Sequence, residues 1–290
     1  MLRIRSNIWS HHSIETGKKY PLKDVLSSMP VEIETFRELV KAVAEISYRN
    51  PEQVLFFRGQ SAEYWKKTED GERINSFYPS IYRSPGRSLT EGELESRYAK
   101  LQKQSEALLG EFKKSGIQGH DKLAKFPELT WAILQHYEVC PTPFVDVSHS
   151  LRVAASFALN DATEFGYIYI FGFPHPNGSI TYSVEHELIN IRLLSICPPE
   201  AQRPYFQEGF LVGTFPSKRL RKHPSLDIGG RLIAKFSLKV NGFWDEHFHA
   251  IPPEALYPAD DLIKKICSEL ATKPESGLTH HSTGPARKTA

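Results

Sequence analysis

Apolar residues recur at helical spacing in the N-terminal half of the chain. Thr35 stands three residues before Glu38, and Thr90 three before Glu93, and both pairs have the spacing of a capping box. Pro127 suits the first turn of a third helix. The sequence predicts a fourth helix that Ser148 caps. The apolar positions of the four helices are, in order, Phe36, Leu39, Val40, Val43 and Ile46; Leu94, Tyr98, Leu101, Leu108 and Phe112; residues 131–137; and Leu151, Ala154, Ala155 and Ala158.

The pattern changes after Gly166, where short runs of β-branched and aromatic residues alternate with Gly and Pro. Such runs are typical of strands. An earlier run over 53–57 ends in Arg58-Gly59 and also predicts a strand, which must join the later ones for its edge to be paired. A last helix is predicted over residues 258–270. The later strands are predicted over 167–173, 179–184, 190–196, 210–215 and 232–240.

Helices first and strands later indicate an α+β fold, with N-terminal helices packed on a mostly antiparallel sheet. Residues 1–33 are polar without clear periodicity and are expected to form an irregular N-terminal arm. Residues 34–272 form one predicted domain. Residues 273–290 are rich in Ser, Thr, Gly and Pro and are expected to be a disordered C-terminal tail.

Composition narrows the class of protein. With 40% hydrophobic and 24% charged residues, the 290-residue chain is neither disordered nor collagen-like. The 36 basic and 34 acidic residues give a net charge of +2. This near-neutral balance disfavours a nucleic-acid partner, and residues 218–223, the densest basic stretch, are expected to be a solvated loop. We find no signal-like segment and no apolar run of membrane-spanning length, so a cytoplasmic protein without a membrane partner is expected.

Several short motifs follow one another in a defined order along the chain. No single motif is specific, but their order over residues 34–270 resembles the FRG domain family, named for its Phe/Tyr-Arg-Gly motif. The motifs are Phe57-Arg58-Gly59-Gln60, Gln135-His136-Tyr137, Pro141-Thr142, Asp146-Val147-Ser148 and Gln207-Glu208-Gly209.

The chain departs from the family pattern between His136 and Ser148. Family members usually continue the Gln-His-Tyr motif as Gly-Leu-Pro-Thr-Arg-Leu-Leu-Asp-Trp-Thr. Here Cys140 is an added residue, Pro143 replaces the arginine and Val147 replaces the tryptophan. A role of that arginine is therefore not carried over.

The chain is similar, more distantly, to ADP-ribosyltransferases of the arginine-serine-glutamate type. Those enzymes have an Arg-Gly pair at the end of a first strand, a Ser-x-Ser segment before a helix, and a late glutamate. Arg58-Gly59 and Ser148-His149-Ser150 correspond to the first two features. At the third, Gln207 is followed two residues later by Gly209 rather than by glutamate. The resemblance implies an ADP-ribosyltransferase-like fold with NAD as substrate, and the departure leaves catalysis open.

A site that cleaves NAD must hold phosphates and stabilise the ribose. Arginine donates two parallel hydrogen bonds to a phosphate, and a following glycine lets the backbone approach the ligand. Cleavage of the glycosidic bond develops positive charge on the ribose, which favours a nearby carboxylate. The expected catalytic residues are Gln207, Glu208, His136 and Asp146, and the expected ligand-binding residues are Arg58, Gly59, Gln60, Ser148 and Ser150.

Each residue type also has a structural alternative. Arg58 can form an ion pair, and Gly59 can simply end the strand. His136 can bond to the backbone, Asp146 can cap a turn, and Ser148 can be a helix cap. The sequence leaves these alternatives open.

Two classes of function also stay open. The chain is an NAD-dependent ADP-ribosyltransferase or NAD glycohydrolase, or a non-catalytic module that binds a nucleotide or a protein through the same pocket. The absence of glutamate at position 209 favours the module. His247 and His249 have the spacing of two metal ligands, but no third cluster accompanies them, so no metal is expected.

Overall fold

The computed structural model describes residues 1–4, 7–68, 70–84 and 87–272, so the predicted C-terminal tail lies outside the described residues. Most predicted strands are present. The strands are β1 (Val31–Ile33), β2 (Val54–Gln60), β3 (Trp65–Lys67), β4 (Arg73–Asn75), β5 (Phe144–Ser148), β6 (Phe165–Phe173), β7 (Ile180–Ser183), β8 (Leu188–Arg192), β9 (Gly209–Thr214) and β10 (Leu232–Lys239).

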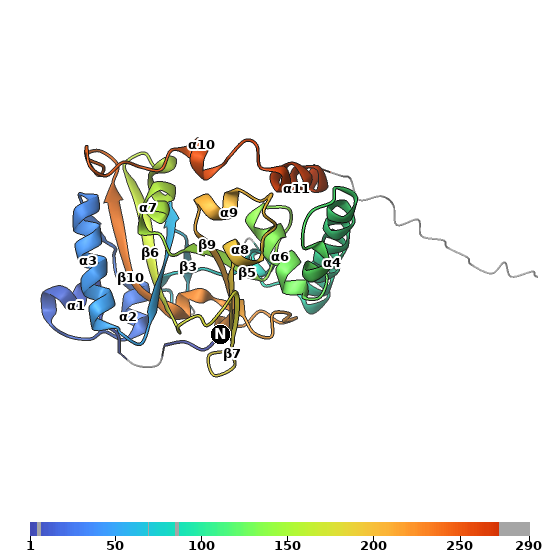
Figure 1. The fold of residues 1–290 in the computed structure, drawn as a ribbon. Coiled ribbons are helices and arrows are strands. Elements are labelled where there is room, and N and C mark those ends of the chain that lie inside the picture. The colour runs from blue at the N-terminus through green and yellow to red at the C-terminus, as the bar shows by residue number, and fades with distance from the viewer. Residues whose placement is uncertain (5–6, 69, 85–86, 273–290) are drawn as a thin grey trace, which may run out of the picture.

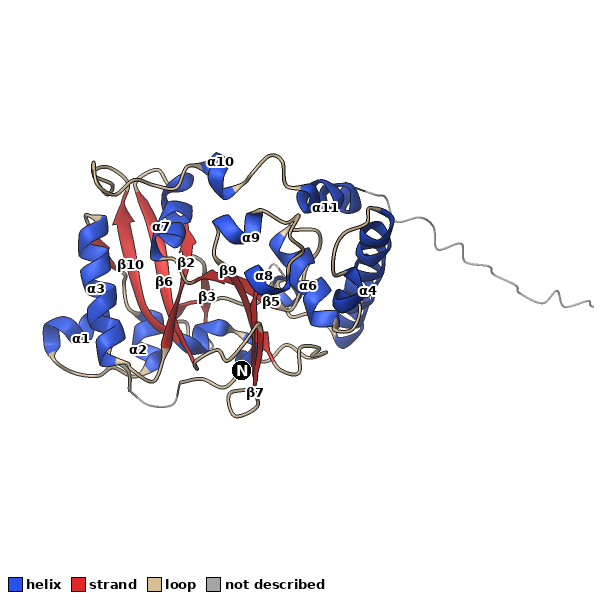
Figure 2. Ribbon diagram, viewed as in Figure 1, coloured by secondary structure: helices blue, strands red, loops and turns tan. Residues whose placement is uncertain are grey.

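Within the described residues, eight of these strands form one sheet, in the order β1-β10-β6-β2-β5-β9-β8-β7. β1 runs parallel to β10, and the other neighbours are antiparallel. Strands β3 and β4 form a separate pair. The fold is therefore α+β with a mostly antiparallel sheet, and the early strand β2 joins the later strands as predicted (Figures 1 and 2).

The helices cover this sheet. The predicted capping residues Thr35 and Thr90 accept hydrogen bonds from Glu38 N and Glu93 N, and Pro127 opens a helix as expected. The helices are α1 (His11–Thr16), α2 (Leu22–Ser27), α3 (Phe36–Arg49), α4 (Glu91–Lys114), α5 (His120–Leu123), α6 (Pro127–His136), α7 (Leu151–Asn160), α8 (Leu193–Ile196), α9 (Arg203–Phe206), α10 (Pro253–Leu256) and α11 (Leu262–Thr272).

Local pattern misses a central strand, and two of its predictions are wrong. Residues 144–148 form β5, a central strand that the sequence did not indicate, and Ser148 is its last residue. The N-cap of α7 is instead Ser150, which accepts a hydrogen bond from Val153 N. The strand predicted over 190–196 ends at Arg192, where α8 begins.

The N-terminal arm is also more ordered than predicted. Its described part contains α1, α2 and β1, and the side chains of Ile8, Val25 and Leu26 belong to the hydrophobic core. Burial of these few apolar residues holds the arm against the sheet, although they are too sparse to give a periodic signal.

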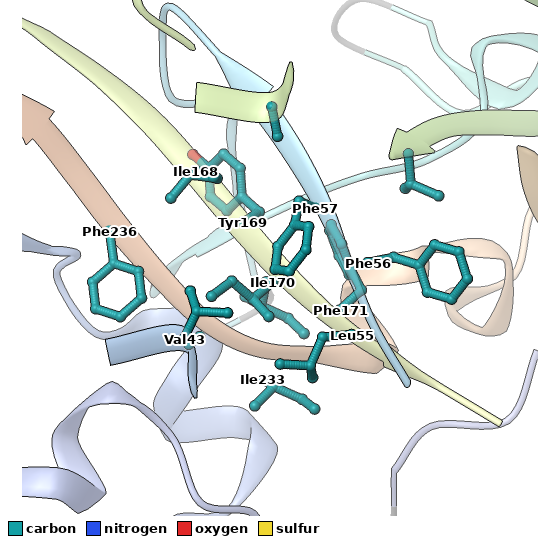
Figure 3. Packing of buried hydrophobic residues seen from close by; sticks show 14 of the residues in the cluster. Val43, Leu55, Phe56, Phe57, Ile168, Tyr169, Ile170, Phe171, Ile233 and Phe236 are labelled. Atoms are coloured by element: carbon teal, nitrogen blue, oxygen red, sulfur yellow. The ribbon is translucent and has the colours of Figure 1, made fainter. Parts of the chain in front are cut away.

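Two hydrophobic clusters divide the molecule. One lies around β10, β6 and β2, where Ile168, Phe57, Phe236 and Val43 pack among one another (Figure 3). The other joins α4, α6 and α11 to the β8 and β9 end of the sheet. Figure 1 shows α3 beside β10 at one end and α4, α6 and α11 at the other. Strands β5, β8 and β9 contribute side chains to both clusters, because alternate residues of a strand point to opposite faces of the sheet.

Gly59 is required by the packing of α7 on β2. A Cβ atom at Gly59 would lie 1.8 Å from the carbonyl oxygen of Ala154 and 2.7 Å from the amide nitrogen of Ala158. A Cβ atom at Gly166, on the neighbouring β6, would likewise lie only 2.2 Å from the carbonyl oxygen of Ala158. The glycine of the Phe-Arg-Gly motif thus lets a helix backbone approach the strand, in the way proposed from sequence for a ligand.

Arg58 points to the opposite face of the sheet, because side chains alternate along a strand. It stands opposite Tyr169 in the register, and Tyr169 stands opposite Lys235. Lys235 is fully buried and donates to Asn75 Oδ1 at 2.6 Å and to Leu26 O at 3.2 Å. Burial lowers the pKa of Lys235 to about 8. This face therefore holds buried polar groups beside the aromatic side chains of Phe77 and Tyr169.

We expect Gly59→Ala to destabilise the protein by about 3 kcal/mol or more, because a methyl group cannot be placed against the α7 backbone. Urea denaturation measures the free energy of unfolding. Gly110→Ala is the matched control, since nothing lies within 4 Å of that Cβ position in α4. It should stabilise by ~0.5–1 kcal/mol through helix propensity. Equal stability of the two variants would contradict the close approach of α7.

Candidate functional site

A cavity of about 190 Å³ opens where β2 and β5 separate. Phe57 opposite Ser148 is the one registered pair between these strands in the described structure. Beyond that pair, Arg58 Nη1 spans the gap and donates to the backbone oxygen of Asp146 at 2.6 Å. The residues around the cavity are Phe57, Arg58, Gly59, His136, Glu138, Asp146, Val147, Ser148, Ala154, Phe157, Arg203, Gln207, Gly209 and Tyr257.

The structure brings together six of the nine site residues predicted from sequence. These are Arg58, Gly59, His136, Asp146, Ser148 and Gln207. Gln60, Ser150 and Glu208 do not line this cavity. Glu208 is exposed and has φ +44°, and Ser150 caps α7.

Asp146 is the polar centre of the cavity. Its Oδ2 accepts a hydrogen bond from Gln135 Nε2 at 2.8 Å, and its Oδ1 lies 3.3 Å from His136 Nδ1. Both partners lie in the last turn of α6, so one helix end presents two side chains to one carboxylate. Gln135 is itself held by a hydrogen bond from the Thr142 hydroxyl. The carboxylate is nonetheless 36% exposed, which leaves it accessible to a ligand.

The protonation states of this pair follow from their surroundings. Burial alone raises the pKa of a carboxyl, but the hydrogen bond with His136 and the charge of Arg58 outweigh it and hold the pKa of Asp146 below its usual value. Burial also dominates at His136, whose pKa is lowered although Asp146 acts in the opposite direction. At neutral pH the carboxylate is ionised and the imidazole is neutral.

The neutral imidazole of His136 carries its proton on Nδ1, because an ionised carboxylate only accepts hydrogen bonds. Nε2 then keeps a lone pair. This atom is buried and has no hydrogen-bond partner among the described residues. An orphaned acceptor beside an ionised carboxylate is the arrangement that a general base needs.

Two predicted residues have structural partners. Ser148 Oγ donates to the backbone oxygen of Gln207 at 2.9 Å and accepts from Ser150 N at 3.0 Å, so it ties β5 to the segment before β9. The Gln207 side chain donates through Nε2 to Leu256 O at 2.8 Å, which fixes the segment that carries Tyr257. The amide of Gln207 is therefore already engaged.

Among the lining residues that sequence reasoning missed, three have polar side chains, Glu138, Arg203 and Tyr257. Arg203 Nη2 donates to Glu138 Oε1 at 2.9 Å, and its guanidinium carbon lies 4.8 Å from the centre of the Tyr257 ring. Arg203 stands four residues before Gln207 of the last motif, but the sequence gives it no role of its own. Glu138 and Tyr257 carry no local signal, because only the fold brings them to α6 and β2.

Other predicted features lie outside the cavity. No group of three or more His, Cys, Asp or Glu side chains that could hold a metal is found in the described ranges. His247 is exposed, with Glu246 as its ion-pair partner. Arg221, Lys222 and His223 line a separate groove with Lys67 and Tyr78. None of the helices in the described part of the chain is long and apolar enough to span a bilayer.

We expect stability to fall as the pH is lowered through 6.5, because the unfolded His136 then takes up a proton that the folded one refuses. Asp146 acts in the same sense at lower pH. Its pKa is lower in the folded than in the unfolded chain, so the unfolded carboxyl takes up a proton first and stability falls. One such group changes the free energy of unfolding by up to ~1.4 kcal/mol per pH unit. Urea denaturation between pH 7.5 and 5 measures the slope.

His136→Gln should reduce this slope, and His247→Gln, at a side chain that is 65% exposed, is the surface control for replacing a histidine. The charged groups that act on His136 are Asp146, Arg203 and Asp261. An unchanged slope in His136→Gln would show that His136 titrates alike in the folded and unfolded chain.

Comparisons with known proteins support one part of the sequence resemblance. No curated protein and no solved structure matches the chain significantly. The comparisons therefore give no support to the similarity to ADP-ribosyltransferases. The family model of the FRG domain matches residues 53–166, which include Arg58, His136, Asp146 and Ser148 but not Arg203 or Gln207. Residues 53–166 are therefore similar to the FRG domain, and this segment supplies ten of the fourteen residues that line the cavity.

Proposed function

We propose that the cavity binds the nicotinamide-ribose part of NAD or a related dinucleotide and cleaves its glycosidic bond. The observation that carries this proposal is a single row across three adjacent strands. Phe57 is paired with Ser148, and Ser148 is paired with Gly209. The Arg-Gly, Ser-x-Ser and Gln-Glu-Gly segments, far apart in sequence, therefore end side by side, as an NAD-cleaving site of this type requires.

The size of the cavity suits part of a dinucleotide. Its volume of about 190 Å³ is below the ~300–1,000 Å³ of pockets that enclose a whole drug-sized ligand. A ring and a ribose can enter while the phosphates stay at the mouth. Phe57, Val147, Ala154 and Phe157 supply apolar surface for the ring.

In this proposal Asp146 replaces the late glutamate. Gly209 stands at the position that glutamate would take, and a Cβ there would lie 2.9 Å from Leu193 Cδ1 and 3.3 Å from His136 Cε1. The His136 ring thus crowds any side chain at position 209. Asp146 provides an ionised carboxylate in the same cavity, suited to stabilising positive charge on the ribose.

His136 accepts the proton in the hydrolytic reaction. The bond between ribose C1′ and the nicotinamide nitrogen breaks, and its electron pair neutralises the pyridinium ring. Water forms the new bond to C1′ and gives its proton to His136 Nε2. The products are nicotinamide and ADP-ribose, so atoms and charge balance. If an acceptor side chain replaces water, the same step is ADP-ribosyl transfer.

We expect Asp146→Asn to lower nicotinamide release by about 10²–10³-fold, because the neutral amide no longer stabilises the charged ribose. NAD affinity should change far less. Glu208→Gln is the control, since Glu208 is an exposed carboxylate that does not line the cavity. Release of nicotinamide is followed by chromatography, and calorimetry measures NAD binding.

The opposite pattern, with Glu208→Gln inactive and Asp146→Asn active, would return catalysis to the late carboxylate. Lack of both NAD binding and nicotinamide release in the unmodified protein would contradict the proposal. Binding without release would support the second candidate function, a non-catalytic nucleotide-binding module. The hydrogen bond from the Gln207 amide to Leu256 O favours that candidate, because this amide is then not free to bind the ribose during cleavage.

A further inference from the structure

Arg203 presents unused hydrogen-bond donors to the cavity. Its side chain is only 10% exposed, and the hydrogen bond to Glu138 is the one that its guanidinium makes within the described chain. Its Nε–H is buried without a partner. A buried charged donor that is left unpaired is costly, so a site with such a donor is suited to an anion that completes its hydrogen bonds.

The position of Arg203 is fixed independently of its side chain. Its backbone nitrogen donates to Asp261 Oδ2 at 2.8 Å, and the same oxygen accepts from the Tyr137 hydroxyl at 2.7 Å. Tyr257 lies under the guanidinium at 4.8 Å. The backbone anchor and the aromatic ring together hold the planar donor group at the cavity wall, which lowers the cost of ordering it when a ligand binds.

Glu138 is only weakly held as the ion-pair partner of Arg203. Its side chain is 74% exposed, and an exposed carboxylate gains little from an ion pair. Its backbone has φ +58°, in the left-handed region that non-glycine residues seldom adopt. Because its carboxylate is exposed, the Glu138 side chain can rotate into solvent with little loss. The cavity would then hold two guanidinium groups, Arg58 and Arg203, against the single carboxylate of Asp146.

Arg58 serves a different purpose. Its Nη1 donates to the backbone oxygen of Asp146 and so bridges the two strands that bound the cavity. Removal of this bond would disturb the sheet, whereas removal of the Arg203 side chain would leave the Asp261 anchor in place. In the cavity, Arg58 therefore stabilises the sheet, and Arg203 is left to bind a ligand.

We infer that Arg203 is the anion-binding residue of this cavity and takes a phosphate of the bound nucleotide, with Glu138 occupying the guanidinium until the phosphate displaces it. The identification of the anion as a nucleotide phosphate rests on the proposed function. The assignment of an anion subsite to Arg203 does not, because it follows from the unpaired donor and the displaceable carboxylate.

Calorimetry on the full chain with two matched probes tests the subsite. Nicotinamide mononucleotide and nicotinamide riboside differ by one phosphate. The unmodified protein should bind the mononucleotide more tightly, and Arg203→Ala should weaken that binding by about tenfold or more while leaving the riboside unchanged. Arg203→Lys should restore part of the affinity, because lysine keeps the charge without the planar fork. Glu138→Gln should tighten mononucleotide binding, since the competing carboxylate is gone.

Arg37→Ala is the matched control. Arg37 Nε pairs with Asp245 Oδ2 at 3.0 Å, and its guanidinium lies 5.0 Å from the centre of the Phe248 ring, but the group is on the surface away from the cavity. This variant should bind both probes as the unmodified protein does. Thermal melting of each variant shows that the fold is retained.

Inorganic pyrophosphate separates the inference from the proposed function. If neither nicotinamide compound binds but pyrophosphate binds, is lost in Arg203→Ala and is strengthened in Glu138→Gln, the dinucleotide proposal fails and the anion subsite stands. If Arg203→Ala binds the mononucleotide or pyrophosphate as tightly as the unmodified protein, or if neither probe binds that protein, the assignment of Arg203 is overturned.

Discussion

The join between β2 and β5 is the constraint on which the rest of the structure depends. One half of the sheet is β1-β10-β6-β2 and the other is β5-β9-β8-β7, and a single registered pair, Phe57 with Ser148, connects them in the described structure. The Arg58 side chain adds a second link through the backbone oxygen of Asp146. Because the strands separate beyond this pair, the sheet stays continuous and yet leaves a cavity in its middle. An arginine suits this position because its long side chain reaches across the gap and its fork retains further donors.

The open join explains why polar groups collect in the interior. Where two strands diverge, their backbone groups and the adjoining helix end need other partners. Arg58 meets part of this need by donating to the backbone oxygen of Asp146. The Asp146 carboxylate receives the side chains of Gln135 and His136 from the end of α6. The remaining groups are not all satisfied, since His136 Nε2 and Arg203 Nε are both buried without partners in the described part of the chain. Two buried nitrogens without hydrogen-bond partners lower the stability of the folded protein. Such unpaired groups are typical of sites where a ligand supplies the missing hydrogen bonds.

Local pattern predicted the helices α3, α4 and α6 and the strands after Gly166 well, because their capping boxes and β-branched runs act within a few residues. It could not predict β5, whose short run follows Pro141 and Pro143 and contains Asp146 in place of an apolar residue. It assigned the α7 cap to Ser148, although the cap is two residues later. The motif order brought out Arg58, His136, Asp146 and Gln207, which do share one cavity. Arg203 and Tyr257 depend on contacts between residues more than fifty positions apart, so their part in the cavity follows from the fold alone.

The missing glutamate and the buried histidine have a common physical cause. A side chain at position 209 would be crowded by Leu193 and the ring of His136, so glycine fits best beside this imidazole in the row that connects β2, β5 and β9. If the cavity needs a negative charge, the charge must therefore come from another strand. β5 supplies it two residues before Ser148, where the carboxylate of Asp146 also fixes the tautomer of His136 and leaves Nε2 without a proton. The same packing that removes a carboxylate from β9 thus makes an acid–base pair possible between β5 and α6.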